Sequence, residues 1–256
     1  MHLRDLQSVR VRPLVLPRVV IRVGTAGWSI PRAASEHFPG AGPHLERYAR
    51  VLNCAEINSS FHRSHATSIY EKWSALTPPG FRFSVKMPRT ITHDLKLRRS
   101  RRLVSRFMSE ASGLGSKLGV ILVQLPPSLE FNSRAAHVFF GLLREYWEGF
   151  VVFEPRHESW FGEKPERVLM AHDVARVATD PSRFKAAKEP AGWRGVTYYR
   201  LHGSPRKYWS RYPPARIAQW RNDLRSVDPA TDAWCIFDNT ASGAATENAV
   251  EMLDGV

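Results

Sequence analysis

Long apolar runs and cysteine are what this 256-residue sequence most clearly lacks. No uninterrupted apolar run approaches the roughly 20 residues that a membrane-spanning helix needs. Residues 1–20 are basic at intervals and contain no apolar stretch of roughly 7 to 15 residues followed by a small-residue cleavage site, so they do not form a secretory signal. These absences predict a soluble protein.

The two cysteines, Cys54 and Cys235, do not form a recognisable motif. Neither belongs to a C-x-x-C or Cys/His spacing, which gives no support for a zinc site or a redox pair and predicts a reducing, cytoplasmic location. Both lie in apolar, strand-like runs where a buried free thiol is ordinary. A disulfide between them stays open as the alternative.

Signatures of several enzyme classes are also absent. The sequence has no G-x-x-x-x-G-K-[ST] phosphate loop, and its GTAGWS segment lacks the G-x-G-x-x-G spacing of a dinucleotide site. A G-x-S-x-G elbow is missing, so serine-hydrolase chemistry has no support. Function must therefore be inferred from residues that the fold brings together.

Positive charge is abundant, formally +13, and most of it is arginine spread along the whole chain. One dense stretch alternates with apolar residues, as the solvated face of an amphipathic helix does. A nucleic-acid-binding patch is the alternative, because clustered cations bind phosphates. The cations of this stretch are Lys96, Arg98, Arg99, Arg101, Arg102 and Arg106.

Short β-branched runs alternate with helical patterns, which is typical of a parallel sheet built from βα units. With 43% apolar residues and a length close to the usual 250 residues or so of such folds, the chain is predicted to form one (β/α)8 TIM-barrel-like domain over residues 19–256. Residues 1–18 are predicted to be a loose basic arm. The expected strands are Val19–Val23, Leu52–Ile57, Phe81–Lys86, Val120–Leu125, Phe150–Glu154, Ala175–Thr179, Val196–Leu201 and Ala233–Phe237.

Two helices of the outer ring have clear start signals. Ser133 is a plausible N-cap for the helical pattern over 133–147, and Pro214 stands in the first turn of the pattern over 214–227. Residues 181–193 contain proline and glycine and predict a long loop with at most a short helix. The final helix, over 247–253, is expected to be brief.

Polar residues stand at the carboxyl ends of six of these strands. Alternate strand residues share a face, which pairs Glu56 with Asn58, Ser84 with Lys86, Glu154 with Arg156, and Arg200 with His202, while Gln124 and Asp180 close two further strands. Unpaired buried ions cost several kcal/mol. We therefore expect these ends to converge on a solvent-accessible mouth, where barrel enzymes hold their active sites.

The mixture of charges at this mouth suits an anionic substrate. Lys86, Arg156 and Arg200 would hold a phosphate or carboxylate, and Glu154 would act as general acid or base, with His202 and Glu56 as auxiliary groups. Ion pairs that only plug the barrel are the competing interpretation for any single pair.

A metal is a further alternative, because Glu56, Glu154, Asp180 and His202 include the ligand types of a divalent ion. The sequence has no H-x-H, H-E-x-x-H or D-x-D spacing, and neighbouring arginines would repel a cation. We therefore expect no cofactor and no metal.

His157, just past a strand end, is either a binding residue or a loop-packing histidine. The aromatic residues Trp28, Trp160, Tyr208 and Trp209 either anchor the core and loops or form the walls of a binding site.

Seven segments of the chain resemble the YecE-like family, catalogued as domain of unknown function 72. These are GTAGWS from Gly24, EINSSFHR from Glu56, FRFSVKMPRTITH from Phe81, LGVILVQLPPS from Leu118, EPRHESW from Glu154, YYRLHG from Tyr198 and FDNTASGAATENA from Phe237. The resemblance implies a TIM-barrel-like fold but no established reaction or cofactor. The polar positions that it carries over are Glu56, Asn58, Lys86, His93, Gln124, Glu154, Arg156, His157, Arg200, His202 and Asn239.

The sequence departs from the family pattern near the expected mouth. Ala26 stands where Ser is common, Ile30 and His62 where Tyr is common, and Asp238 where Asn is common.

The sequence is compatible with three functions: an enzyme of hydrolase, lyase or isomerase type acting on an anionic small molecule, a nucleic-acid-binding or phosphodiester-processing barrel, and a metabolite-binding protein without catalysis. The oligomeric state is not predicted.

Overall fold

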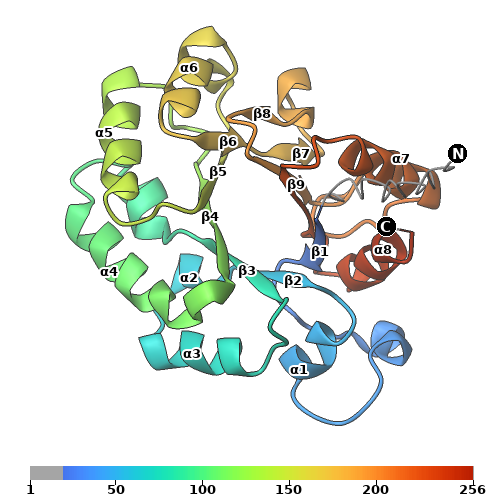
Figure 1. Cartoon of the computed structure of the whole chain (residues 1–256). Coiled ribbons are helices and arrows are strands. Elements are labelled where there is room, and N and C mark those ends of the chain that lie inside the picture. The colour runs from blue at the N-terminus through green and yellow to red at the C-terminus, as the bar shows by residue number, and fades with distance from the viewer. Residues whose placement is uncertain (1–19, 256) are drawn as a thin grey trace, which may run out of the picture.

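Strands and helices alternate along the chain in this computed structural model, which describes residues 20–255 (Figure 1). The predicted arm over residues 1–18, and Val19 of the predicted first strand, lie outside the described residues. The strands are β1 Ile21–Thr25, β2 Cys54–Ile57, β3 Arg82–Lys86, β4 Leu118–Gln124, β5 Phe150–Glu154, β6 Val174–Arg176, β7 Ala178–Asp180, β8 Ala191–Gly192, β9 Val196–Leu201 and β10 Asp232–Phe237.

The helices lie outside the strands, which surround a common centre (Figure 1). The α-helices are α1 His44–Ala49, α2 Ser59–His62, α3 Thr67–Ala75, α4 Arg101–Ala111, α5 Ser133–Arg144, α6 Glu163–Ala171, α7 Pro214–Arg225 and α8 Ala244–Leu253. Shorter helical segments are η1 Arg32–His37, η2 Thr90–Asp94, η3 Ser112–Lys117, η4 Glu158–Trp160 and η5 Lys185–Lys188.

The strands form two sheets, which confirms the predicted α/β class with parallel pairing. One sheet has the order β2-β3-β4-β5-β6-β8, with β8 antiparallel to β6, and the other has the order β1-β10-β9-β7, all parallel. At one junction, β1 and β2 are linked by an isolated bridge between Ala26 and Glu56. Within residues 20–255 the ladders therefore belong to two sheets and do not run as one closed set.

The second junction lies within the predicted sixth strand, which is divided in two. β6 pairs with β5, and after Val177 the chain continues as β7, which pairs with β9. The Val177 amide still donates to the Phe153 carbonyl at 2.9 Å. The segment predicted as a loop over residues 181–193 contains the short η5, as expected, and also the two-residue strand β8, which was not predicted.

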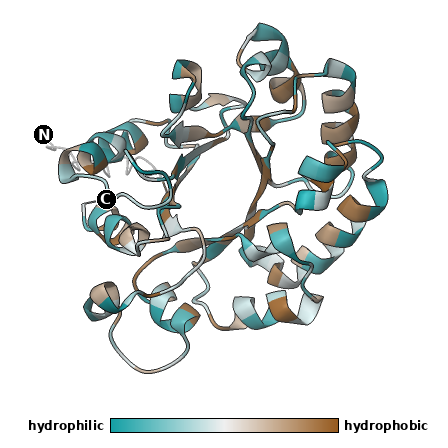
Figure 2. Cartoon of the chain, turned by 180° about the vertical axis from the view of Figure 1, so that it is seen from behind, coloured by the Kyte–Doolittle hydropathy of each residue, from teal (hydrophilic) through white to brown (hydrophobic). Residues whose placement is uncertain are grey.

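Two apolar layers flank the strands. Within β4, Val120 and Leu122 belong to an inner cluster with Tyr198 and Trp234, whereas Ile121 and Val123 pack in the larger cluster under the helices. Both faces of a central strand are thus buried, as in parallel sheets covered by helices. Figure 2 shows hydrophobic strands at the centre and helices that are only partly hydrophobic.

The segments predicted to be helical do contain helices, but several boundaries differ from the predicted ones. α5 begins at Ser133, but its cap is Asn132, whose side chain accepts from the Ala135 amide at 2.8 Å. α7 begins at Pro214, as predicted. The basic stretch is helical only from Arg101, and α8 begins at Ala244, before the predicted start.

The structure also bears on the cysteines and on membrane insertion. Cys54 and Cys235 are buried free thiols, and burial raises the pKa of both. Among residues 20–255, no helix combines the length and the apolar character required to cross a bilayer.

Candidate functional site

Polar side chains form the last inward-facing row at the carboxyl ends of the strands. The inner cluster contains Cys54, Leu122, Val152 and Tyr198, and the next residue on the same face is Glu56, Gln124, Glu154 and Arg200 respectively. On the inward face, the side chains therefore change from mainly apolar to polar over two residues at the end of each of these strands. We call Arg200, Glu56, Glu154 and Asp238 the Arg200 cluster.

Arg200 lies at the centre of this cluster and is 1% exposed. Its Nε and Nη2 donate to Glu56 at 2.7 to 3.1 Å, and its Nη1 donates to Glu154 Oε2 at 3.1 Å. Nη2 also lies 3.0 Å from Asp238 Oδ2. Burial opposes the charged form of Arg200, but Glu56, Asp238 and Glu154 outweigh it and hold its pKa well above the ordinary value.

Glu154 is held as a carboxylate by donors on several sides. Gln124 Nε2 donates to Oε2 at 2.9 Å, and Arg156 donates to Oε1 through Nε at 3.0 Å and Nη2 at 2.8 Å. Burial raises the pKa of Glu154, but Arg156, Arg200 and His202 together leave it well below its usual range. A carboxylate with so low a pKa is a poor proton acceptor.

His202 lies between two carboxylates and is 1% exposed. Its Nδ1 is hydrogen-bonded to Asp238 Oδ2 at 2.9 Å. Its Nε2 is 3.4 Å from Glu154 Oε1, yet this atom is buried without a hydrogen-bond partner among the described residues. Buried nitrogen atoms are rarely left unpaired, so Nε2 is available to a ligand or to water.

Lys86 is buried at the end of β3 and is 8% exposed. Its Nζ lies 4.1 Å from the centre of the Phe61 ring, and His93 packs edge-on against the same ring. Burial and the nearby Arg200 lower the pKa of Lys86 to about 8, although Glu56, Glu154 and Asp238 act in the opposite direction. Asn58, the residue paired with Glu56 by sequence, has a buried Oδ1 without a partner in the described part of the chain.

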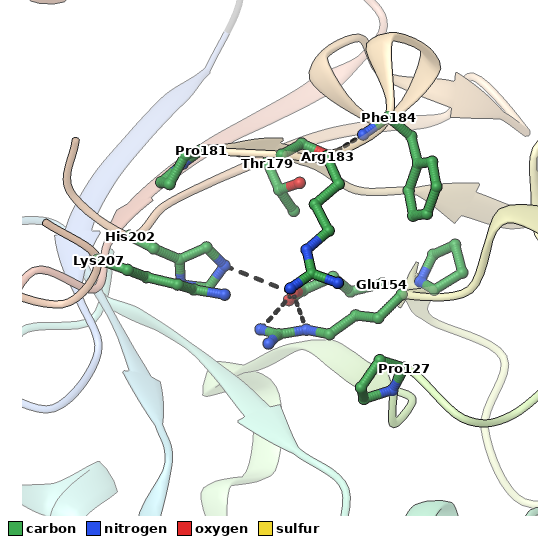
Figure 3. Close-up of a pocket in the computed structure, with 11 residues that line it drawn as sticks. Pro127, Glu154, Thr179, Pro181, Arg183, Phe184, His202 and Lys207 are labelled. Atoms are coloured by element: carbon green, nitrogen blue, oxygen red, sulfur yellow. Dashed lines mark hydrogen bonds and ion pairs between the residues drawn. The ribbon is translucent and has the colours of Figure 1, made fainter. Parts of the chain in front are cut away.

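A cavity of about 400 Å³ opens beside Glu154 and His202 (Figure 3). Arg183 and Lys207 extend into it from two different loops, after β7 and after β9. Neither forms an ion pair with any carboxylate of residues 20–255. We call this cavity the strand-end pocket; it is lined by Pro127, Glu154, Pro155, Arg156, Thr179, Pro181, Ser182, Arg183, Phe184, His202 and Lys207.

Comparison with known proteins identifies the family of this chain. The family model described as "Protein of unknown function DUF72" matches residues 22–256. The chain belongs to the DUF72 family. This confirms the YecE-like resemblance seen in the sequence.

Relatives of this DUF72 protein include two curated bacterial proteins. The UPF0759 protein YecE of Escherichia coli K12 is 30% identical over 176 residues, which cover 66% of this chain and 62% of YecE. The match thus spans less than two thirds of that relative. The UPF0759 protein YunF of Bacillus subtilis is 21% identical over 267 residues, 92% of this chain and 94% of YunF.

Solved DUF72 structures share the fold. One from Enterococcus faecalis has a TM-score of 0.76 at 18% identity and covers 92% of this chain and 94% of that chain. One from Thermotoga maritima has a TM-score of 0.75 at 22% identity, with coverages of 92% and 98%. At such identities the likeness concerns architecture alone.

Two polar positions predicted for the site serve other contacts in the structure. The Asp180 side chain accepts from Tyr212 Oη at 3.0 Å and lies 3.5 Å from Arg216 Nη2, away from the Arg200 cluster. His157 caps η4, where its Nδ1 accepts from the Ser159 amide at 3.3 Å. Both residues stabilise segments next to the pocket.

Asn239 and Trp28 also have structural partners. Asn239 is fully buried and donates to the Ser210 carbonyl at 2.8 Å and to Asn248 Oδ1 at 3.0 Å. Trp28 packs edge-on against Trp73 with ring centres 5.1 Å apart. The structure thus gathers Glu56, Lys86, Gln124, Glu154, Arg156, Arg200 and His202 at the strand ends, whereas these two residues fix loops and helices.

Four residues with roles at the site were not among the predicted site residues. Asp238 was noted only as a departure from the family pattern, and it pairs with both Arg200 and His202. Tyr198 stands two residues before Arg200, so strand phase was a usable signal; its hydroxyl donates to Glu56 at 2.9 Å. Arg183 and Lys207 lie in loops, where no periodicity indicates direction.

The arrangement of these groups also bears on metal binding. Among the described residues, no three His, Cys, Asp or Glu side chains form a group that could hold a metal ion. Arg200 occupies the space between Glu56, Glu154 and Asp238 and binds all three. The expectation that no metal is used stays a prediction.

Proposed function

We propose that this protein is an enzyme of (β/α)8-barrel type that binds an anionic small molecule in the strand-end pocket and moves a proton through His202. Two features of the described residues together carry the proposal. Arg183 and Lys207 are cations without carboxylate partners there, and a buried His202 Nε2 without a hydrogen-bond partner lies beside the same cavity. A phosphate or carboxylate would supply the missing counter-charge.

The roles follow from the contacts. Asp238 orients His202 through Nδ1, which leaves Nε2 directed toward Glu154 and the pocket, in the manner of a general base or acid held by a carboxylate. Glu154 remains ionised and positions Arg156, whose guanidinium lines the pocket. The reaction class, among hydrolysis, lyase chemistry and isomerisation, stays open.

A ligand screen tests the proposal. We would measure thermal unfolding at fixed ionic strength with phosphorylated metabolites and small carboxylates, for the unaltered protein and for Arg183→Ala and Lys207→Ala. A ligand at about 100 times its Kd stabilises by about 2.7 kcal/mol, roughly 5 to 10 °C for a domain of this size. We expect at least one anion to give such a shift and both variants to reduce it.

The same screen addresses the nucleic-acid alternative. Arg98, Arg99 and Arg134 line a surface groove of about 310 Å³ on the outer side of the molecule. If oligonucleotides alone raise the unfolding temperature, and Arg183→Ala and Lys207→Ala leave that shift unchanged, the strand-end pocket has no ligand of the proposed class. His202→Gln is the matched test of the proton-transfer role: it should retain ligand-induced stabilisation while losing turnover.

A further inference from the structure

We propose that Lys86 is a nucleophile that forms a Schiff base with a carbonyl-bearing substrate. The proposal deepens the proposed function, on which its anionic substrate class rests, by adding a ketone or aldehyde group to that substrate. Three observations carry it: the burial of Lys86, the absence of a carboxylate partner among residues 20–255, and its place on the inward face at the end of a strand.

Lys86 is not part of the ion-pair network around it. Each carboxylate of the Arg200 cluster is already bound by a guanidinium, and within residues 20–255 no carboxylate lies within ion-pair distance of Lys86 Nζ. The Lys86 ammonium instead lies over the face of the Phe61 ring. A buried lysine that only balanced charge would be expected to contact a carboxylate.

The position of Lys86 is suitable for chemistry. It lies opposite Leu122 in the β3–β4 register, and Gln124, two residues further along the same strand face, donates to Glu154. Lys86 therefore lies on the same inward face as Gln124 and Glu154, one alternate residue before them in the register, and Glu154 lines the strand-end pocket.

The surroundings also favour the neutral amine, which is the reactive form. Burial and Arg200 disfavour the ammonium, and the pKa of Lys86 is lowered to about 8. Desolvation next to a second cation is a recognised way of activating a lysine amine. Burial, Lys86 and nearby arginines lower the pKa of His93, so a neutral imidazole is available near the amine to accept a proton.

The reaction balances without a redox partner. The Nζ lone pair forms a bond to the carbonyl carbon, the π pair moves to oxygen, and a proton passes from nitrogen to that oxygen to give a carbinolamine. Protonation of the hydroxyl and its departure as water leave the protonated imine, which can lose its nitrogen-bound proton. Amine plus carbonyl thus gives imine plus water.

Reductive trapping tests the proposal. The full chain would be incubated at pH 7.5 with pyruvate, with glycolaldehyde phosphate, and with neutral hydroxyacetone, then treated with sodium borohydride and mapped by peptide mass spectrometry. Exposed Lys72 and Lys164 serve as internal references in the same sample. We expect modification of Lys86 at least about tenfold above these references, because lowering a lysine pKa by one unit raises its neutral fraction about tenfold.

Variants and the choice of probe separate the possible outcomes. Lys86→Arg, which keeps the charge, should abolish the adduct, and Lys164→Arg should not. If no carbonyl modifies Lys86 above the references while anions still stabilise the protein through Arg183 and Lys207, the Schiff-base proposal is overturned and the pocket proposal stands. If hydroxyacetone modifies Lys86 as well as the anionic carbonyls do, the Schiff base is supported and the anionic substrate class is not.

Discussion

The Arg200 cluster and the strand-end pocket are adjacent, and both contain arginine, yet they use it differently. In the cluster, Arg200 binds three carboxylates, and none of the charged groups is more than one tenth exposed. In the pocket, Arg183 and Lys207 have no carboxylate partner among residues 20–255. Removing one member of a buried ion pair is costly because its partner is left uncompensated, whereas an unpaired exposed charge is available to a ligand.

The largest expected effect is on stability when Arg200 is removed. Arg200→Met leaves Glu56, Glu154 and Asp238 buried without their common counter-ion, which should cost about 3 to 5 kcal/mol of the free energy of unfolding, or prevent folding. Arg211→Met is the matched control, because Arg211 is 54% exposed and pairs with Glu247 and Glu251 at the surface. Urea unfolding should show a loss below about 1 kcal/mol for the control. Equal losses for both variants would contradict the comparison.

Lys86 should produce a smaller effect with a distinct pH dependence. The pKa of Lys86 is about 8 in the folded protein and 10.5 ordinarily. At pH 7 folding therefore buries a charged ammonium, which lowers the free energy of unfolding. Between about pH 8 and 10.5 the unfolded chain binds more protons, and the free energy of unfolding rises with pH by up to about 3 kcal/mol. Lys86→Met should therefore stabilise the protein at pH 7, and this advantage should vanish above about pH 10.5. Denaturant titrations across this range would show it; a constant difference between the two proteins would contradict the assignment.

The smallest expected effect concerns the stability of the pocket variants. Arg183→Ala and Lys207→Ala remove exposed side chains that have no carboxylate partner in the described part of the chain, so each should change the free energy of unfolding by less than about 0.5 kcal/mol. The measurement is unfolding in urea without ligand. A loss above about 1 kcal/mol would show that these cations stabilise the fold and would remove the contrast between pocket and cluster.

Strand phase explains which parts of the site could be predicted. Glu56, Glu154 and Arg200 lie far apart in the sequence, yet each was predicted to stand at a strand end and to meet the others at one mouth, and the structure joins them by hydrogen bonds. The same rule could have found Tyr198. It is informative here because a strand has only two faces.

Periodicity could not predict the remaining features. Arg183 and Lys207 lie in loops, whose direction depends on tertiary contacts. Asp180 ends a strand opposite Leu201, on the face that packs under the helices, where Tyr212 and Arg216 are its partners. The sixth strand is divided at Val177 because its first half pairs with β5 and its second half with β9. The amino-acid composition of a strand does not indicate which strand it pairs with.

Arg200 also has a consequence for cooperativity. It belongs to β9 in the four-stranded sheet, together with Asp238 just after β10, whereas Glu56 and Glu154 belong to β2 and β5 of the six-stranded sheet. One side chain thus connects two sheets that share few backbone hydrogen bonds where β1 meets β2. Glu56 of the six-stranded sheet is paired with Arg200 of the other sheet, so separating the sheets exposes or strands a buried charge and the two sheets should unfold together.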